Sequence, residues 1–177
     1  MSTILIEIAL FLMILASITD FLYYRIPNCI VGLLLILYPL FTFSLGLPFT
    51  FHPYLLFLIV LICGFALFYF GLIGGGDAKF LSVTALWIGW SKILSFLFFV
   101  GLIGGLLGII LMVMPKIINV ATKRIRNFLQ KQRLLSPIIK CLTCGNNKEV
   151  EKDILAMQKA RMVPYAIAIT AAAILLL

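Results

Sequence analysis

The chain alternates long apolar runs with short polar breaks. A helix that spans a bilayer needs about 20 apolar residues, and most of the runs have lengths close to this number, while the fourth and the sixth are shorter. They lie at about residues 3–20, 29–46, 54–73, 77–90, 93–114 and 162–177. We therefore predict an all-α, polytopic integral membrane protein with six transmembrane helices, forming a single membrane-embedded domain over residues 1–177.

The composition supports this prediction. Of the 177 residues, 64% are hydrophobic and 11% are charged, and the mean hydropathy is +1.22. A soluble domain is about half apolar and about a quarter charged, and a disordered chain is less hydrophobic still. Both classes are excluded, and six spans leave no room for a large soluble domain.

The basic residues predict the orientation. With six spans, Arg25, Lys79 and the eleven basic residues of 115–161 lie on one side, and Lys92 alone lies on the other. The positive-inside rule places the richer side in the cytoplasm and both termini outside. The net charge of +8 then reflects topology and attraction to anionic membrane lipids. No nucleic-acid-binding motif accompanies the charge, so we expect no nucleic-acid partner.

The long loop 115–161 has helical patterns of its own. Apolar residues recur at helical spacing across 114–135, which predicts an amphipathic helix in the cytoplasmic interface, and a solvated connector is the alternative. These residues are Met114, Ile117, Ile118, Ala121, Ile125, Phe128 and Leu129. A second helix is predicted to start near Asn147, because a helix N-terminus favours acids such as Glu149, Glu151 and Asp153.

Two of the six acidic residues stand at span ends on the same predicted face. Asp20 closes the first span and Asp77 opens the fourth, whereas Glu7 precedes Asp20 by thirteen residues, or about 20 Å of helix. Two carboxylates that lie close together share one proton. One can then take a proton from water while the other donates to a carbonyl oxygen, which hydrolyses a peptide bond without a metal or other cofactor. The alternatives are an interfacial anchor at Asp20 and a helix N-cap at Asp77.

Three glycines precede the second aspartate. Gly74, Gly75 and Gly76 are expected to permit unusual backbone angles and the close approach of another backbone. A substrate held as an extended strand needs such access, because its backbone polar groups need partners at that depth.

Three segments resemble the signatures of one family. Asp20-Phe-Leu-Tyr-Tyr-Arg-Ile26-Pro27-Asn28 resembles the D-x5-(I/L)-P-(N/D) signature of type IV prepilin peptidases. Gly74-Gly75-Gly76-Asp77-Ala78-Lys79 resembles their GxGDxK signature. Val163-Pro164-Tyr165-Ala166 resembles their Pro-aromatic-Gly segment at the start of the last helix, with Ala166 in place of glycine.

The resemblance implies a function and a set of site residues. The family consists of membrane aspartic proteases that cleave the basic leader of prepilins and pseudopilins at the cytoplasmic surface of the bacterial cytoplasmic membrane. It implies that Asp20 and Asp77 are catalytic, that Lys79 supports them, and that Pro27 and Asn28 shape a turn. For Lys79 the alternative is a positive-inside anchor, and for Pro27-Asn28 it is a helix boundary without a catalytic part.

The sequence departs from the longer family members. These carry an N-terminal cytoplasmic domain with two Cys-x-x-Cys pairs, and they also methylate the new N-terminus of the pilin. This sequence begins in its first span and therefore resembles the short, six-helix members that serve Flp-type (tight-adherence) pili. We expect no methyltransferase activity.

Other residues leave alternatives open. Cys141 and Cys144 form a Cys-x-x-Cys pair in the loop, which suits zinc shared between two chains, a redox pair, or two reduced thiols. Small residues on the fifth span suit close packing within the chain or between copies, so an oligomer is left open. They are Gly101, Gly104, Gly105 and Gly108. Trp87 and Trp90 are expected in an aromatic belt at the membrane interface.

Three other functions compete with the peptidase. A transporter component could bind a proton or cation at Asp20 and Asp77, but such acids usually lie near the midplane of internally repeated folds. A non-catalytic assembly factor of a pilus or secretion machine would tolerate asparagine at both positions. Another GxGD-type protease would carry a Tyr-Asp motif, which the sequence lacks around Asp20.

Overall fold

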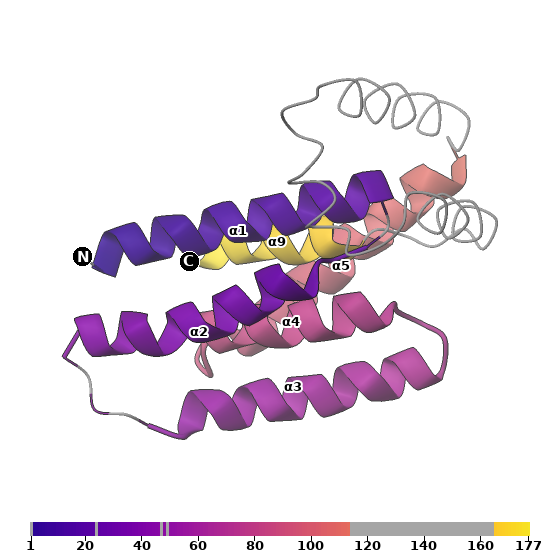
Figure 1. Ribbon diagram of the computed structural model, residues 1–177. Coiled ribbons are helices and arrows are strands. Elements are labelled where there is room, and N and C mark those ends of the chain that lie inside the picture. Colours follow the sequence, from indigo (N-terminus) through magenta and orange to yellow (C-terminus); the bar gives the residue numbers. More distant parts are fainter. Residues whose placement is uncertain (1, 24, 47, 49, 114–164) are drawn as a thin grey trace, which may run out of the picture.

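The computed structural model describes residues 2–23, 25–46, 48, 50–113 and 165–177, and in this part the chain runs up and down as antiparallel helices (Figure 1). The helices are α1 (Ser2–Tyr23), α2 (Asn28–Ser44), α3 (His52–Tyr69), α4 (Gly75–Ile88), α5 (Ile93–Val113) and α9 (Tyr165–Leu176). The described ranges contain no strand, which confirms the all-α prediction. The predicted loop helices and Cys141 and Cys144 lie outside the described residues.

The first connection is set by a proline. Helix α1 continues to Tyr23, so Asp20 lies about one turn inside the helix rather than at its end. The residue before a proline is disfavoured in the helical region, and Arg25, Ile26 and Pro27 are not helical. Pro27 (φ −64°, ψ 128°) caps α2, and its carbonyl oxygen accepts the Ile30 N–H at 3.1 Å.

Glycines end two of the helices. Helix α3 stops at Tyr69, four residues before the predicted end of its span, because Gly71 adopts a left-handed φ of 71°. Helix α4 ends at Ile88, where Gly89 has a φ of 76°. The turn at Gly71 lets α3 and α4 pack against each other as antiparallel neighbours, and the turn at Gly89 leads into α5.

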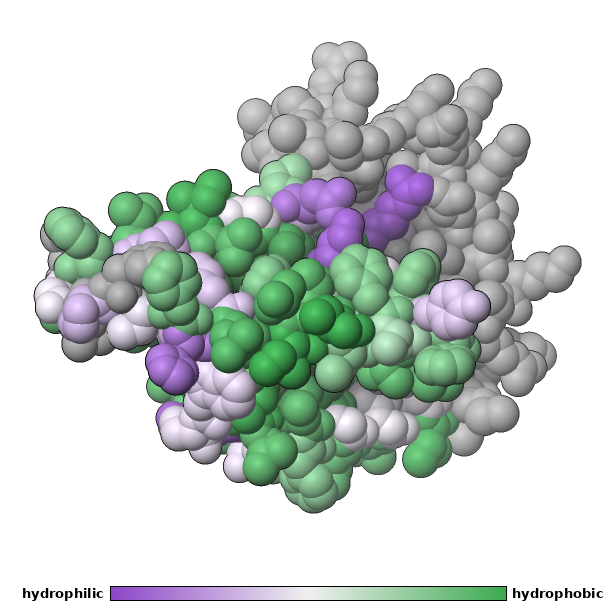
Figure 2. Space-filling view, turned by 90° about the horizontal axis from the view of Figure 1, so that it is seen from below, coloured by the Kyte–Doolittle hydropathy of each residue, from purple (hydrophilic) through white to green (hydrophobic). Residues whose placement is uncertain are grey.

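The outer surface of the bundle is that of an integral membrane protein. Three helical segments are long and apolar enough to cross a membrane, namely Thr3–Tyr23, His52–Tyr69 and Ile93–Ile110. Asn28–Ser44 and Tyr165–Leu176 are shorter apolar helices. Figure 2 shows one face on which apolar residues form a broad area, while hydrophilic residues gather beside the grey part and toward the opposite end.

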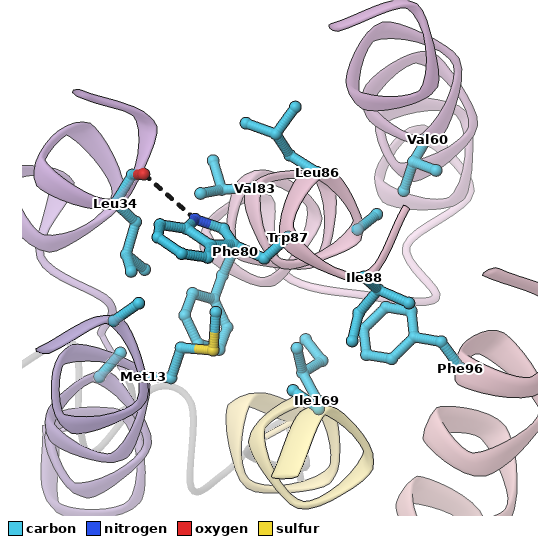
Figure 3. Packing of buried hydrophobic residues seen from close by; sticks show 14 of the residues in the cluster. Met13, Leu34, Val60, Phe80, Val83, Leu86, Trp87, Ile88, Phe96 and Ile169 are labelled. Carbon is cyan, nitrogen blue, oxygen red and sulfur yellow. Dashed lines mark hydrogen bonds between the residues drawn. The ribbon is translucent and has the colours of Figure 1, made fainter. Parts of the chain in front are cut away.

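Helix α4 is the centre of the bundle. It packs against α2, α3, α5 and α9, and nine of its fourteen residues are buried. Figure 3 shows Phe80 of α4 beside Met13 of α1 and Ile169 of α9. A helix enclosed by other helices presents little surface to lipid, so it can carry polar residues when they are hydrogen-bonded.

The aromatic-belt prediction is wrong for Trp87. Its ring is 8% exposed and packs inside the bundle, where its N–H donates to the Leu34 carbonyl oxygen at 3.2 Å (Figure 3). The indole is buried because it fills space beside Tyr38 and Phe41 and finds a partner for its one donor. Trp90 remains 47% exposed.

Close packing of α3 on α4 yields a prediction for stability. A Cβ atom at Gly64 would lie 3.1 Å from the Ala78 Cβ and 3.3 Å from its Cα. Gly64→Leu is therefore expected to force the two helices apart and to lower the free energy of unfolding by about 1–3 kcal/mol, measured by denaturation of the detergent-purified protein. The control is Gly32→Leu on α2, because a Cβ atom there meets nothing within 4 Å. Equal loss in both variants would contradict the prediction.

Candidate active site

The fold brings Asp20 and Asp77 to the same end of the bundle. Asp20 lies near the C-terminal end of α1, and Asp77 is the third residue of α4. Figure 1 shows that α1 ends and α4 begins at the same end, opposite the two chain termini. The two aspartates are 57 positions apart in sequence, yet the segment that follows Asp20 contacts the start of the helix that carries Asp77.

Asp20 is held by the last helix. Its side chain is buried, with 5% exposed, and a buried carboxylate needs hydrogen-bond donors. The backbone N–H of Ala166 donates to Asp20 Oδ2 at 3.2 Å. Ala166 is the second residue of α9, so the donor belongs to the last helix of the chain. Asp20 therefore links the end of α1 to the start of α9.

Asp77 is held by its own helix. The N–H of the N-cap residue Gly74 donates to the Asp77 carboxylate, which is half of the capping-box arrangement of an N-cap and an acidic residue at N3. The other oxygen, Oδ1, is buried and has no hydrogen-bond partner among the described residues. The alternative of an N-cap at Asp77 is wrong, because Gly74 is the N-cap residue and Asp77 lies at N3.

The prediction that the three glycines adopt unusual backbone angles is wrong, and only Gly74 is needed for lack of space. None has a positive φ, and Gly74 (φ −74°, ψ 147°) has extended angles that other residues adopt. A Cβ atom at Gly74 would lie 2.8 Å from Asp77 Oδ2, which is too close. A Cβ atom at Gly75 would meet Phe68 at 3.5 Å, which is an ordinary contact.

The two sequence motifs touch each other. A Cβ atom at Gly76 would lie 3.6 Å from the Cβ of Ile26, so the segment after Asp20 packs against the start of α4. Pro27 is buried and Asn28 is exposed. This contact helps to hold the ends of α1 and α4 together.

Lys79 is not brought to the carboxylates. Its side chain is exposed. Lys79 follows Asp77 by two positions on the helix, so the two side chains point in directions that differ by about 200° around the helix axis. Within the described part of the chain, Lys79 makes no hydrogen bond or ion pair. This position fits the alternative of an anchor at the membrane surface.

Sequence reasoning missed the polar residues that surround Asp20 from α1 and α9. Ser17 lies one turn before Asp20, and Thr170 lies one turn after Ala166, and both hydroxyl groups are buried. The sequence does offer one signal of these residues, because each is a polar residue within an otherwise apolar run. That signal is weak, because a Ser or Thr hydroxyl in a helix also bonds to its own backbone.

No metal site is evident in the described ranges. They contain no group of three or more His, Cys, Asp and Glu side chains that could hold an ion, and Cys29 and Cys63 are free and exposed. The proposed alternatives for Cys141 and Cys144 remain predictions.

Comparison with known proteins identifies the family. The model of a family described as the type IV leader peptidase family matches residues 8–109, which is more than half of the 177 residues and includes both Asp20 and Asp77. The chain therefore belongs to the type IV leader peptidase family, a family of peptidases. No curated protein and no solved structure matches the chain.

Proposed function

We propose that the protein is a membrane aspartic endopeptidase that cleaves the basic leader from type IV, Flp-type prepilins at the cytoplasmic face of the bacterial cytoplasmic membrane. The observation that carries the proposal is the pairing of Asp20 with Asp77. Two acids from distant parts of an apolar chain lie at the same end of the bundle, where Ile26 of the first motif packs against Gly76 of the second. Placing two carboxylates next to each other away from water costs free energy, and such pairs are typical of functional sites.

The proposed chemistry uses both carboxyl groups. The pair holds one proton, and the ionised member takes a proton from a water molecule as that water attacks the scissile carbonyl carbon. The protonated member donates its proton to the carbonyl oxygen, which gives a gem-diol intermediate. The carboxyl group that took the proton from water then passes it to the amide nitrogen, the C–N bond breaks, and a gem-diol hydroxyl returns its proton to the other carboxylate. The Ala166 and Gly74 N–H groups hold the carboxylates in place. The unpartnered Asp77 Oδ1 is available to the water or to the carbonyl.

The proposed position of the site in the membrane suits the substrate. Helix α4 has 14 residues, or about 21 Å, and the hydrocarbon core is about 30 Å thick. The Gly74–Asp77 end of α4 then lies at or slightly beneath the membrane surface. Arg25 and Lys79 flank this end, and the positive-inside rule assigns it to the cytoplasm. Both chain termini then lie outside, and the site faces the compartment that holds the basic leader.

Incubation of the detergent-purified protein with a Flp-type prepilin tests the proposed function. We expect a single cut between the basic leader and the apolar segment in the presence of a metal chelator, because neither carboxyl role needs a metal. Mass spectrometry should show hydrolysis and an unmethylated new N-terminus. A prepilin that stays intact, or that is cut only when metal is added, would contradict the proposal.

A further inference from the structure

We propose that the first turn of α9 is a positioning element for Asp20, held in place by the Ser17–Thr170 hydroxyl pair and by the glycine at position 104 of α5. This inference rests on the proposed function, because it assigns to these residues the task of aiming one catalytic carboxylate. It also gives a role to the last helix, which lies outside the residues matched by the family model.

The first part of the evidence is the contact with the carboxylate. Ala166 is fully buried, and its N–H is the donor to Asp20 Oδ2 at 3.2 Å. In the described part of the chain, no other hydrogen bond to the Asp20 side chain is observed. The orientation of this carboxylate therefore depends on where α9 begins relative to α1. The positive end of the α9 dipole also favours the negative charge at this position.

The second part is a set of hydrogen bonds that ties α9 to α1 next to Asp20. Ser17 Oγ lies 2.9 Å from the Ala166 carbonyl oxygen, so the residue that donates to Asp20 also accepts from Ser17. The Thr170 hydroxyl can donate to Ser17 Oγ at 2.5 Å while Ser17 donates to Ala166, and the Thr170 oxygen also lies 3.1 Å from the Met13 carbonyl oxygen. Both hydroxyl side chains are less than 9% exposed. Hydrogen bonds of this kind hold helices together in apolar surroundings.

The third part is the packing of α5 behind the same turn. A Cβ atom at Gly104 would lie 2.8 Å from Tyr165 Cε1 and 3.1 Å from its Cδ1, because the ring rests on the α5 backbone. Tyr165 directly precedes Ala166. On the same helix, Cβ atoms at Gly101 and Gly105 would meet nothing within 4 Å. Of these three glycines, only Gly104 is thus needed for packing among the described residues.

Helix α9 also contacts the helix that carries Asp77. It packs against α1, α4 and α5, and Ile169 of α9 lies beside Met13 and Phe80 in the core (Figure 3). A shift of α9 would therefore change the position of Asp20 relative to Asp77. A displacement of about 1 Å in an active site can lower a rate by about a hundredfold.

The glycine test uses one damaging substitution and two matched controls. Gly104→Ala is expected to displace Tyr165 and to lower kcat for cleavage of a Flp-type prepilin at least about tenfold, with KM changed less than about threefold. Gly101→Ala and Gly105→Ala on the same helix are expected to keep the parental kcat. Thermal denaturation of the detergent-purified variants checks folding. Equal kcat in the three variants would overturn the role of Gly104.

The hydroxyl test does not depend on the glycine variants. Ser17→Ala and Thr170→Val are each expected to lower kcat about tenfold, and the double variant is expected to lose no more than the worse single one, because the two groups act as a unit. Thr170→Ser, which keeps the hydroxyl, should restore kcat. The controls are Ser82→Ala and Thr84→Val, whose buried hydroxyls bond only to carbonyls of α4 itself. Losses equal to those of the controls, or no rescue by serine, would overturn the inference.

Failure of this inference differs from failure of the proposed function. If Asp20→Asn and Asp77→Asn abolish cleavage while the Ser17, Thr170 and Gly104 variants behave as their controls do, the peptidase stands and the positioning role falls. If both asparagine variants cleave normally, the proposed function falls, and the positioning role falls with it.

Discussion

Replacement of either aspartate by asparagine is expected to lower kcat for prepilin cleavage by about 10²–10⁴-fold, the range that general acid–base groups contribute. Asparagine has nearly the same shape as aspartate, and its amide oxygen can still accept the N–H of Ala166 or Gly74. The packing should therefore survive. The variant loses the charge that takes a proton from water and the ability to exchange that proton with the partner.

Gel mobility of a co-expressed Flp-type prepilin measures this prediction, and kinetics of the purified variants gives its size. Glu7→Gln is the matched control, because Glu7 lies on the same helix as Asp20, is exposed, and is about 20 Å away along the helix axis. It should cleave like the parent. Normal processing by both Asp20→Asn and Asp77→Asn would exclude the two-carboxylate mechanism and favour an assembly factor.

Gly74→Ala is expected to lower kcat about a hundredfold, because the added methyl group would lie 2.8 Å from Asp77 Oδ2. The backbone angles of Gly74 suit alanine, so the helix can still form. The carboxylate is the group that has to move, and it then loses the bond from the Gly74 N–H and its position relative to Asp20. The expected defect is therefore in kcat and not in the amount of folded protein.

Gly75→Ala is the comparison variant for this prediction. Its methyl group would meet Phe68 at an ordinary distance of 3.5 Å, and alanine is preferred over glycine inside a helix. We expect its kcat to stay within about threefold of the parent, measured with the same prepilin under the same conditions. If Gly75→Ala lowers kcat as much as Gly74→Ala does, the cause of the loss is a change in the backbone and not the contact with Asp77.

Much of the fold was predictable because the membrane imposes strong rules. A span needs about 20 apolar residues in a helix, so runs of that length at known positions predict helices directly. All six predicted spans overlap helices of the described chain. The ends were less predictable, since α1 runs past Asp20 to Tyr23 and α3 stops early at Gly71. Local turn geometry decides such ends, and the apolar pattern does not record it.

The candidate site divides in the same way. Asp20 and Asp77 could be predicted as site residues from the sequence, because acidic residues are rare in the chain and these two lie in recognisable motifs. The environment of Asp20 could not be predicted from the sequence. Its hydrogen-bond donor Ala166 is 146 positions away and donates through a backbone N–H, which every residue except proline has. The partnership of Ser17 with Thr170 spans 153 positions. It depends on how two helices are rotated about their axes.

The sequence by itself determined the class of protein, the order of its helices and the choice of Asp20 and Asp77 as candidate site residues, because apolar length and scarce charge can be read directly along the chain. Only the tertiary structure decided that α4 lies at the centre, that Gly74 is needed for space and not for its backbone angles, and that Trp87 is buried. It also decided which groups hold each carboxylate. Those outcomes depend on distances between helices that are far apart in sequence, and side-chain packing sets these distances.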